Sequence, residues 1–283
     1  MRRIAFINEK GGTGKTTLAV NLAAYFAQRK GLTTLLVDLD TQGHAGKSLG
    51  IDVRNVKPNA FHFLCDRGVR LEEVMHPTMV PKLFLVPSYR EMSEFPTVMG
   101  TDARRARRLS DKLQAANLAG FDVILFDSPP SLGLTTLNIL LASTEVVIPV
   151  ALTYLALDGC AEIVETARRV AEEHGQTDLS ISLVVPTLYR HTVLAEEILE
   201  KLRSYFPGKL AKTSLAFNVK IDEAQSHGKT IWEYSPSSRG AQMLAAIAEE
   251  VLTAQPPAPE RSARLTGAST VQVAPEELAD NGP

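Results

Sequence analysis

A glycine-rich segment near the N-terminus, NEKGGTGKTT at residues 8–17, contains the residue types that bind phosphate groups. It follows the apolar run IAFI and precedes a helical pattern, which is the context in which a P-loop forms. Its glycines let backbone N–H groups turn inward around phosphate oxygens, and the helix adds its positive end. Lys15 is expected to contact the β- and γ-phosphates, and the Thr16 hydroxyl to ligate Mg²⁺. From this loop we expect nucleotide contacts at Gly11, Gly12, Thr13, Gly14, Lys15, Thr16 and Thr17.

The loop departs from the common pattern G-x-x-x-x-G-K-[ST] at its first glycine. Aligned on Gly14 and Lys15, that glycine falls at position 9, where this chain has Glu9 followed by a second lysine, Lys10. The common pattern needs only one lysine, so the second one calls for a separate role.

Acidic residues follow two other apolar segments. VILFDSPP supplies Asp127, which would hold Mg²⁺ through water, and LLVDLDTQG supplies Asp38 and Asp40. Carboxylates at such positions can hold Mg²⁺ or orient the attacking water. A single aspartate at a strand end is usually a solvated turn residue. Three of them in a chain with a P-loop favour a magnesium–nucleotide site.

Short apolar runs alternate with helical patterns along the chain, and these elements must position the loop and the acids. We expect strands at residues 4–7, 33–39, 83–87, 123–127, 145–150, 181–185 and 210–215. We expect helices between the first two strands and at about 102–118, 158–174, 192–205 and 239–253. Continuously apolar strands joined through helices predict a mostly parallel, twisted α/β sheet with helices on both faces. The expected fold is therefore the three-layer α/β/α P-loop NTPase.

The composition limits the remaining possibilities. The net charge is −2, so any contact with nucleic acid needs a local basic patch. No apolar stretch reaches the roughly 20 residues that span a bilayer, and the two cysteines form no metal-binding motif, so we expect a cytoplasmic protein. We predict one ATPase domain at residues 1–253 and a disordered Pro/Ala-rich tail at 254–283.

Five segments, in order, resemble the ParA/Soj partition ATPases, which belong to the MinD/ParA branch of P-loop NTPases with a deviant Walker A motif. They are KGGTGKTT, VDLDTQG, VILFDSPPSLGLTTLNIL, IPVALTYLALDG and FNVKIDEAQSHGKTIWEYSPSSRGAQ. The resemblance covers about residues 1–253 and implies ATP and Mg²⁺ as cofactors. It also implies an ATP-bound homodimer in which Lys10 reaches the nucleotide of the other subunit. A cation supplied in this way would neutralise phosphate charge and make dimerisation depend on ATP.

The same resemblance assigns further residues. Asp40 matches the family's water-positioning aspartate, so the expected catalytic residues are Lys10, Lys15 and Asp40. Asp38 matches an acidic residue of the magnesium site, which gives Thr16, Asp38 and Asp127 as the metal set. Asn218 lies in the late loop that packs on adenine and ribose.

The chain departs from the family pattern at three places. Thr41 and His44 stand in DTQGH where relatives have DPQGN, and Gln225 stands in EAQS where they have EAPS. The P-loop also begins at once, without a DNA-reading domain before it, so we expect no recognition of a specific operator.

Family members in the ATP state bind DNA without sequence preference through basic residues, largely by phosphate electrostatics. The matching positions here are Arg190, Lys220, Lys229 and Arg239. A separate cluster, ARRARRLSDK, places arginines 104, 105, 107 and 108 on the helix expected at 102–118. A solvated helix face and a DNA contact are equally good interpretations of that cluster.

The resemblance predicts an ATP-driven partition switch on the nucleoid. A ParB-like or cargo-linked protein would stimulate its slow hydrolysis, and the cargo would be chromosome or plasmid DNA. One alternative is a protein cargo, such as a chemoreceptor cluster or a microcompartment. A second is a metabolic P-loop enzyme of the amidoligase type. A membrane-cycling role is disfavoured because the last helical segment has no Lys or Arg after its first residue. An iron–sulfur relative is rejected because DSPPSLG contains no cysteine.

Overall fold

The computed structural model describes residues 1–254 except 154, 155 and 177. The strands, in chain order, are β1 (Arg2–Phe6), β2 (Thr34–Asp38), β3 (His76–Pro77), β4 (Leu83–Val86), β5 (Val123–Asp127), β6 (Glu145–Ala151), β7 (Ser180–Tyr189) and β8 (Leu215–Ala216). The helices are α1 (Lys15–Lys30), α2 (His44–Ser48), α3 (Ala60–Cys65), α4 (Leu71–Val74), α5 (Phe95–Met99), α6 (Arg108–Ala115), α7 (Leu134–Ala142), α8 (Ala156–His174), α9 (Val193–Tyr205), α10 (Val219–Ser226), α11 (Ile231–Tyr234) and α12 (Arg239–Thr253).

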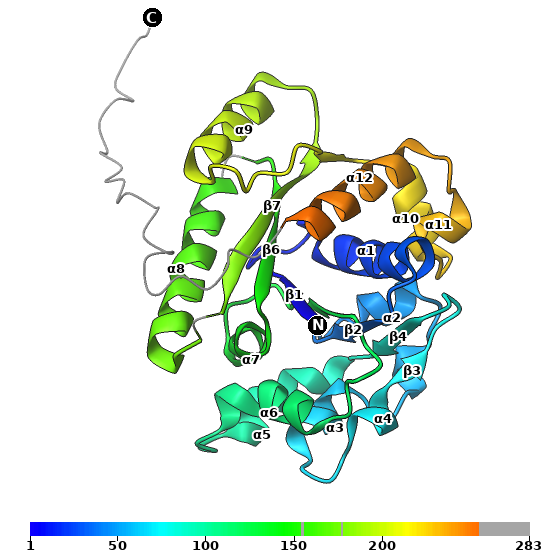
Figure 1. Cartoon of the computed structure of the whole chain (residues 1–283), viewed down its shortest axis with the longest axis vertical. Helices are drawn as coiled ribbons and strands as arrows, with labels where there is room; N and C mark the ends of the chain where they lie inside the picture. The colour runs from blue at the N-terminus through cyan, green and yellow to red at the C-terminus, as the bar shows by residue number, and fades with distance from the viewer. Residues whose placement is uncertain (154–155, 177, 255–283) are drawn as a thin grey trace, which may run out of the picture.

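Within the described residues the strands form one eight-stranded sheet in the order β3-β4-β2-β5-β1-β6-β7-β8. Only the short β3 runs antiparallel to its neighbour; the other pairs are parallel. Strand β1 lies between β5 and β6, and β2 lies on the far side of β5 (Figure 1). The carboxyl ends of β1, β2 and β5 therefore meet at one edge of the sheet.

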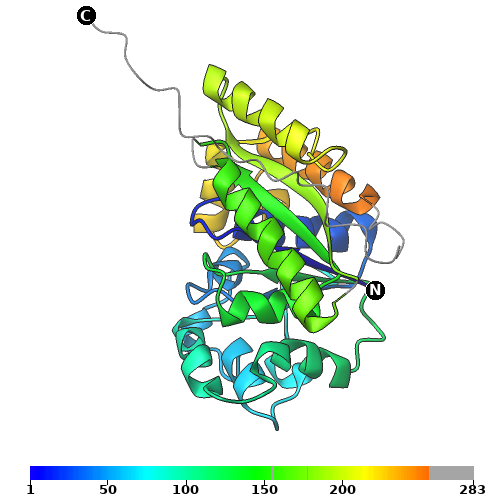
Figure 2. The same cartoon turned by 90° about the vertical axis from the view of Figure 1, so that its left-hand side faces the viewer.

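Helices cover both faces of this sheet, and the alternation of side chains along β1 shows the division. Ile4 and Phe6 pack into a core with α1 and α12, whereas Ala5 and Ile7 pack into the opposite core with α7 and α8. The rotated view places α8 in front of β6 and β7 (Figure 2). This arrangement is the expected three-layer α/β/α fold, because strands that are apolar on both sides need a helical layer on each face.

Two expected elements are much shorter than predicted. The strand expected at 210–215 is confined to β8, and Leu210 makes only an isolated bridge with Val184. The helix expected at 102–118 is only α6, preceded by the 3₁₀ turn Arg105–Arg107. The Asp102 carboxylate accepts a hydrogen bond from Arg104 N at 2.7 Å, which stabilises a turn in place of the first helical residues.

Helix α7 was not expected from periodicity. It is apolar almost all round and nearly all its residues are buried, so it has no polar face to reveal a helical period. The predicted tail at 254–283 lies outside the described residues after Ala254.

Candidate nucleotide site

The phosphate-binding loop joins β1 to α1 and is held by contacts that its own sequence does not reveal. Gly12 and Gly14 have φ values of 72° and 87°, which only glycine adopts readily. Asn8 accepts a hydrogen bond from Lys10 N at 2.9 Å and donates to Pro149 O at 2.7 Å, so it ties the loop to β6. Thr187 of β7 donates to Thr13 O at 2.8 Å. The loop is thus fixed to two strands beyond the one it follows.

Helix α1 presents its amino end to this loop. Its first intrahelical bond runs from Leu18 N to Gly14 O, so the N–H groups of Lys15, Thr16 and Thr17 have no helical carbonyl to bind. No side chain caps this end, and no acidic residue lies in the first turn. The amino end can therefore bind an anion through its N–H groups and its dipole.

Two buried carboxylates lie at the strand ends beneath the loop. Asp38 and Asp127 are register partners on β2 and β5, and both are fully buried. Asp38 accepts hydrogen bonds from Asp40 N at 3.0 Å and Ala45 N at 3.2 Å. Neither oxygen of Asp127 has a full hydrogen bond from the described residues, although the Thr16 hydroxyl interacts with this carboxylate. A buried carboxylate whose oxygens lack full hydrogen bonds is expected at a position that binds a metal ion.

Electrostatics at these carboxylates agree with that interpretation. Burial raises the pKa of Asp127 to about 7, with the Asp40 carboxylate adding to the rise and Thr16 and Lys15 opposing it. Burial, then the Asp127 carboxylate, raises the pKa of Asp38 well above its usual range. Burial lowers the pKa of Lys15, against the attraction of Asp127 and Asp40. The site therefore places the buried carboxyl groups of Asp38, Asp40 and Asp127 near the Lys15 ammonium, and a bound cation would stabilise their ionised forms.

The described residues contain no group of three His, Cys, Asp or Glu side chains close enough to hold a metal ion. This agrees with the chemistry of Mg²⁺, which takes one or two carboxylates and completes its shell with water and substrate phosphates. Asp127, Asp38 and the Thr16 hydroxyl fit that requirement.

Lys15 and Asp40 are held near this site. The Lys15 ammonium donates to Lys10 O at 3.0 Å and is buried together with its side chain. Asp40 is also buried, and its Oδ1 accepts from Gln42 N at 3.0 Å and from the Thr41 hydroxyl at 3.4 Å. Both contacts use one oxygen, so Oδ2 can accept a further hydrogen bond.

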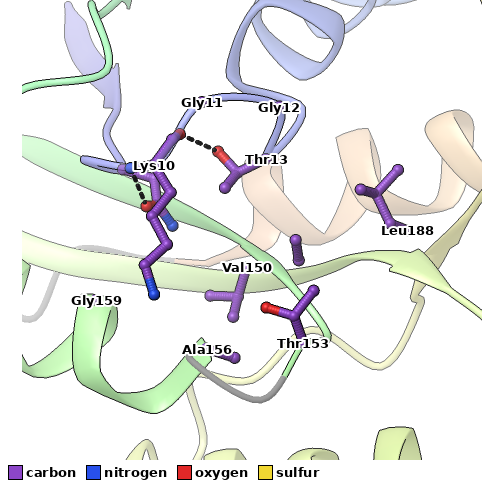
Figure 3. Close-up of a pocket in the computed structure, with 11 residues that line it drawn as sticks. Lys10, Gly11, Gly12, Thr13, Val150, Thr153, Ala156, Gly159 and Leu188 are labelled. Carbon is purple, nitrogen blue, oxygen red and sulfur yellow. Dashed lines mark hydrogen bonds between the residues drawn. The ribbon is translucent and has the colours of Figure 1, made fainter.

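Lys10 and Glu9 turn toward α8 of their own chain. Lys10 Cε and Nζ lie 3.5 and 3.7 Å from the place a Cβ on Gly159 would occupy, and Glu9 Oε1 lies 3.4 Å from it. Figure 3 shows Lys10 extending to Gly159 at the edge of a pocket of about 180 Å³, which Thr13 and Leu188 also line. Burial, followed by the nearby Glu162, raises the pKa of Glu9. Glu9 Oε1 therefore lies beside α8.

Residues 217–242, called here the late segment, contact α1. Asn218 is the N-cap of α10, and its side chain accepts from Lys220 N at 3.0 Å. It packs closely on Gly240, where an added Cβ would stand 2.9 Å from Asn218 Oδ1. Gln225 Nε2 donates to the Thr17 hydroxyl at 2.9 Å. The structure therefore brings the late segment to α1 through Gln225, a residue noted in the sequence only as a departure.

The two groups of basic residues differ in their surroundings. Arg190, Lys220, Lys229 and Arg239 are exposed, and Lys220 also pairs with Glu223 at 2.8 Å.

The arginines at 104–108 do not form one exposed helix face, which corrects the expectation from sequence. Arg104 pairs with Asp111 at 2.5 Å, and Arg105, Arg107 and Arg108 donate to backbone carbonyls of Gly100, His174 and Leu64. Arg108 is only 8% exposed. Their guanidinium groups are bound to other parts of the protein, which disfavours a DNA contact there.

Sequence reasoning missed Asn8, Thr187 and Ser128 as supports of the site. Ser128 donates to Phe6 O at 2.7 Å and so joins the end of β5 to the start of the loop. A polar residue directly after an apolar strand was the only available signal for Asn8 and Ser128. Thr187 gives no signal, because threonine is an ordinary strand residue.

The fold and this site together define a P-loop ATPase whose phosphate loop carries a second lysine. An AAA-domain family model matches residues 1–181. The Soj protein of Bacillus subtilis, named a sporulation initiation inhibitor, is 39% identical over 88% of this chain and 97% of its own. PomZ of Myxococcus xanthus, named a cell division protein, is 34% identical over 89% of this chain and 78% of its own. The chain belongs to the Soj/ParA family of partitioning ATPases.

The solved structures agree with this assignment of fold. The cobyrinic acid a,c-diamide synthase of Mycobacterium smegmatis, with ADP and magnesium bound, matches with a TM-score of 0.75 and 26% identity. The match covers 89% of this chain and 94% of that one. Among the described residues, no helix has both the length and the apolar character of a membrane span.

Proposed function

We propose that this protein is an ATP-driven partition switch. In its ATP state two copies would form a sandwich dimer, bind DNA without sequence preference on the nucleoid, and hydrolyse ATP when a ParB-like partner stimulates them. The observation that carries this proposal is the buried Asp38–Asp127 pair at the P-loop, together with Lys10. Family membership supports the partition role.

The proposed nucleotide contacts are the loop residues Gly11–Thr17, Lys10 of the second copy, and Asn218 beside the base and ribose. Mg²⁺, when bound, would neutralise charge on the phosphate oxygens; Thr16, Asp38 and Asp127 are the residues that would hold it. The Lys15 ammonium, which donates to Lys10 O in this structure, would exchange that carbonyl for phosphate oxygens. Asp40 would accept a proton or hydrogen bond from the attacking water at Oδ2.

Lys10 gives the proposed switch its dependence on dimerisation. Its side chain lies over Gly159 of its own chain in this structure, and in the proposed dimer it would contact the nucleotide of the second subunit. Lys10 could neutralise phosphate charge, and so stabilise the dimer, only when a nucleotide and a second subunit are both present. Dimer formation would then report the nucleotide state.

The proposed DNA contact uses Arg190, Lys220, Lys229 and Arg239. All four are exposed. Lys220 lies in the first turn of α10, near the start of the late segment, and Arg239 is the first residue of α12, near its end. With a net charge of only −2, the chain does not repel DNA strongly as a whole, so a local patch can dominate.

Two other functions have specific support. The match to PomZ, named a cell division protein, favours a protein cargo positioned by the same ATP cycle. The match to a cobyrinic acid a,c-diamide synthase favours, less strongly, a metabolic enzyme of the amidoligase type. ATP turnover that requires a small-molecule acceptor would identify the latter.

The test is binding to random-sequence duplex DNA with ATP, with ADP and without nucleotide, at two salt concentrations. Binding that needs ATP and weakens with salt is the expected result. Absence of binding in every state would overturn the DNA part of the proposal and favour the metabolic alternative. If binding is found, a pull-down with the protein encoded by the neighbouring gene would separate a DNA-bound partner from a protein cargo.

A further inference from the structure

A single side-chain hydrogen bond joins the start of α1 to α10. Gln225 Nε2 lies 2.9 Å from Thr17 Oγ1, and the two residues are 208 positions apart in the chain. Thr17 is the third residue of α1, directly after Thr16, and Gln225 is the last but one residue of α10. Both side chains are partly buried, which reduces the competition of solvent for this contact.

A second contact one helical turn further along α1 holds the same late segment. Asn21 Oδ1 accepts from Ile231 N, and Asn21 O accepts from Trp232 Nε1, both at 2.9 Å. Thr17 and Asn21 share one face of α1, since they are four residues apart. Gln225 is therefore held against α1 by a segment that is itself anchored on α1.

The hydrogen bond from Gln225 makes the Thr17 hydroxyl oxygen an acceptor. A hydroxyl has one proton to donate and two lone pairs that accept. The Gln225 amide supplies a donor, so Thr17 Oγ1 is the acceptor and its own proton is directed elsewhere. The Thr17 backbone N–H also has no helical carbonyl to bind, because the helix begins at Lys15.

We propose that Gln225 is a positioning residue for the nucleotide. Its amide fixes the Thr17 hydroxyl as an acceptor and thereby aims the hydroxyl proton at a phosphate oxygen, beside the Thr17 N–H. This inference rests on the proposed assignment of Thr17 to the nucleotide site. Because Gln225 and Lys220 share α10, the same bond joins the nucleotide to the proposed DNA-contacting surface.

Two substitutions at Gln225 test this role, one by removing the hydrogen-bond donor and the other by replacing it with an acceptor. Gln225→Leu removes the donor, and we expect Mg²⁺-dependent affinity for ADP and for a non-hydrolysable ATP analogue to fall about fivefold, the usual effect of removing one neutral hydrogen bond. Gln225→Glu keeps the shape but accepts the Thr17 proton and adds charge near the phosphates. We expect that variant to bind nucleotide about tenfold or more weakly than wild type. Affinity is measured by calorimetry on the full chain.

The Thr17→Val background separates positioning from a purely structural role. Valine keeps the shape of threonine and lacks the hydroxyl, so in that background Gln225→Leu should cause no further decrease in nucleotide affinity. A decrease of the same size with and without the hydroxyl would overturn the proposal. So would wild-type affinity in both Gln225 variants. Gln114→Leu and Gln114→Glu, at an exposed glutamine of α6, are the matched controls and should leave affinity unchanged.

A DNA measurement distinguishes this inference from the proposed function. If wild-type protein binds DNA only with ATP, Gln225→Leu at saturating nucleotide should reduce the ratio of DNA affinities with and without ATP. An unchanged ratio would overturn the link to Lys220. If the wild type does not bind DNA, the partition proposal fails, while the calorimetric comparison still decides the role of Gln225.

Discussion

Asp38 and Asp127 lie opposite each other on the neighbouring parallel strands β2 and β5, and each is the last residue of its strand. Strand β1, which leads into the phosphate loop, pairs with β5 on its other side and places Phe6 opposite Asp127. Three strand ends thus bring two buried carboxylates and a cationic loop together. Burial raises the pKa of both carboxyls, so a metal ion bound together with phosphates would stabilise their ionised forms.

The second lysine should control assembly. We expect Lys10→Ala to abolish dimerisation with a non-hydrolysable ATP analogue, measured by light scattering, because no cation would then cross to the partner's phosphates. Hydrolysis should fall to background. Lys57→Ala, at an exposed lysine paired with Glu91, is the control and should dimerise normally. Normal assembly and turnover in Lys10→Ala would leave the second lysine without the role proposed for it.

Removing the carboxylate of Asp40, which follows β2, should slow ATP hydrolysis without weakening ATP binding. Asp40→Ala is expected to bind ATP about as tightly as wild type, because Asp40 is proposed to contact water and not phosphate. Its steady-state hydrolysis should drop about 10²-fold or more, the usual effect of removing a general base. Asp178→Ala, at an exposed position, is the matched control. A wild-type rate in Asp40→Ala would remove this residue from the reaction.

The raised pKa of Asp127 predicts a pH dependence of stability in the metal-free protein. Its pKa is about 7 when folded and about 4 when unfolded, so between these values only the folded state keeps the proton. The free energy of unfolding should therefore fall as pH rises from about 4 to 7 and then level off, by at most a few kcal/mol. Asp127→Asn removes this contribution, so its stability relative to wild type should be higher at pH 8 than at pH 5. Denaturant titration at both values measures it, and an equal difference at the two would contradict the raised pKa.

The basic residues Lys220 of α10 and Arg239 of α12 should increase DNA affinity by neutralising phosphate charge. Lys220→Ala with Arg239→Ala is expected to weaken binding to random duplex DNA in the ATP state. The slope of log affinity against log salt should become shallower by about 0.9 for each phosphate group that the variant no longer neutralises. Arg54→Ala with Lys57→Ala, at exposed residues that pair with Asp52 and Glu91, should not change the slope. An unchanged slope in the first variant would place the DNA-binding surface elsewhere.

Close backbone packing between the late segment and the end of α2 should affect stability. Gly228 has φ 63°, and an added Cβ would lie 2.8 Å from Gly50 Cα. Gly228→Ala should lower the free energy of unfolding by about 2 kcal/mol or more, from conformational strain plus the clash. Gly175→Ala is the control, because Gly175 has φ 64° and nothing within 4 Å of its Cβ position. Strain alone should lower its free energy of unfolding by about 1 kcal/mol. Equal decreases would show that the packing against Gly50 relaxes freely.

Local patterns were enough to predict the fold class and the main elements. The P-loop spacing, the continuous apolar runs and the helix that follows Lys15 depend on residues close together in the chain. They predicted the parallel sheet with helices on both faces and the carboxylates at strand ends. The helix at 102–118 failed for an equally local reason, since the Asp102 side chain stabilises a turn.

The sequence by itself determined the phosphate loop, the strand-end aspartates and the three-layer architecture, because each follows from residue type and short-range periodicity. Only the tertiary structure decided which residues support that loop. Asn8 reaches β6, Thr187 of β7 holds Thr13, and Gln225 meets Thr17 after 208 residues. These contacts depend on strand order and on where late helices return to α1, and no local pattern carries that information.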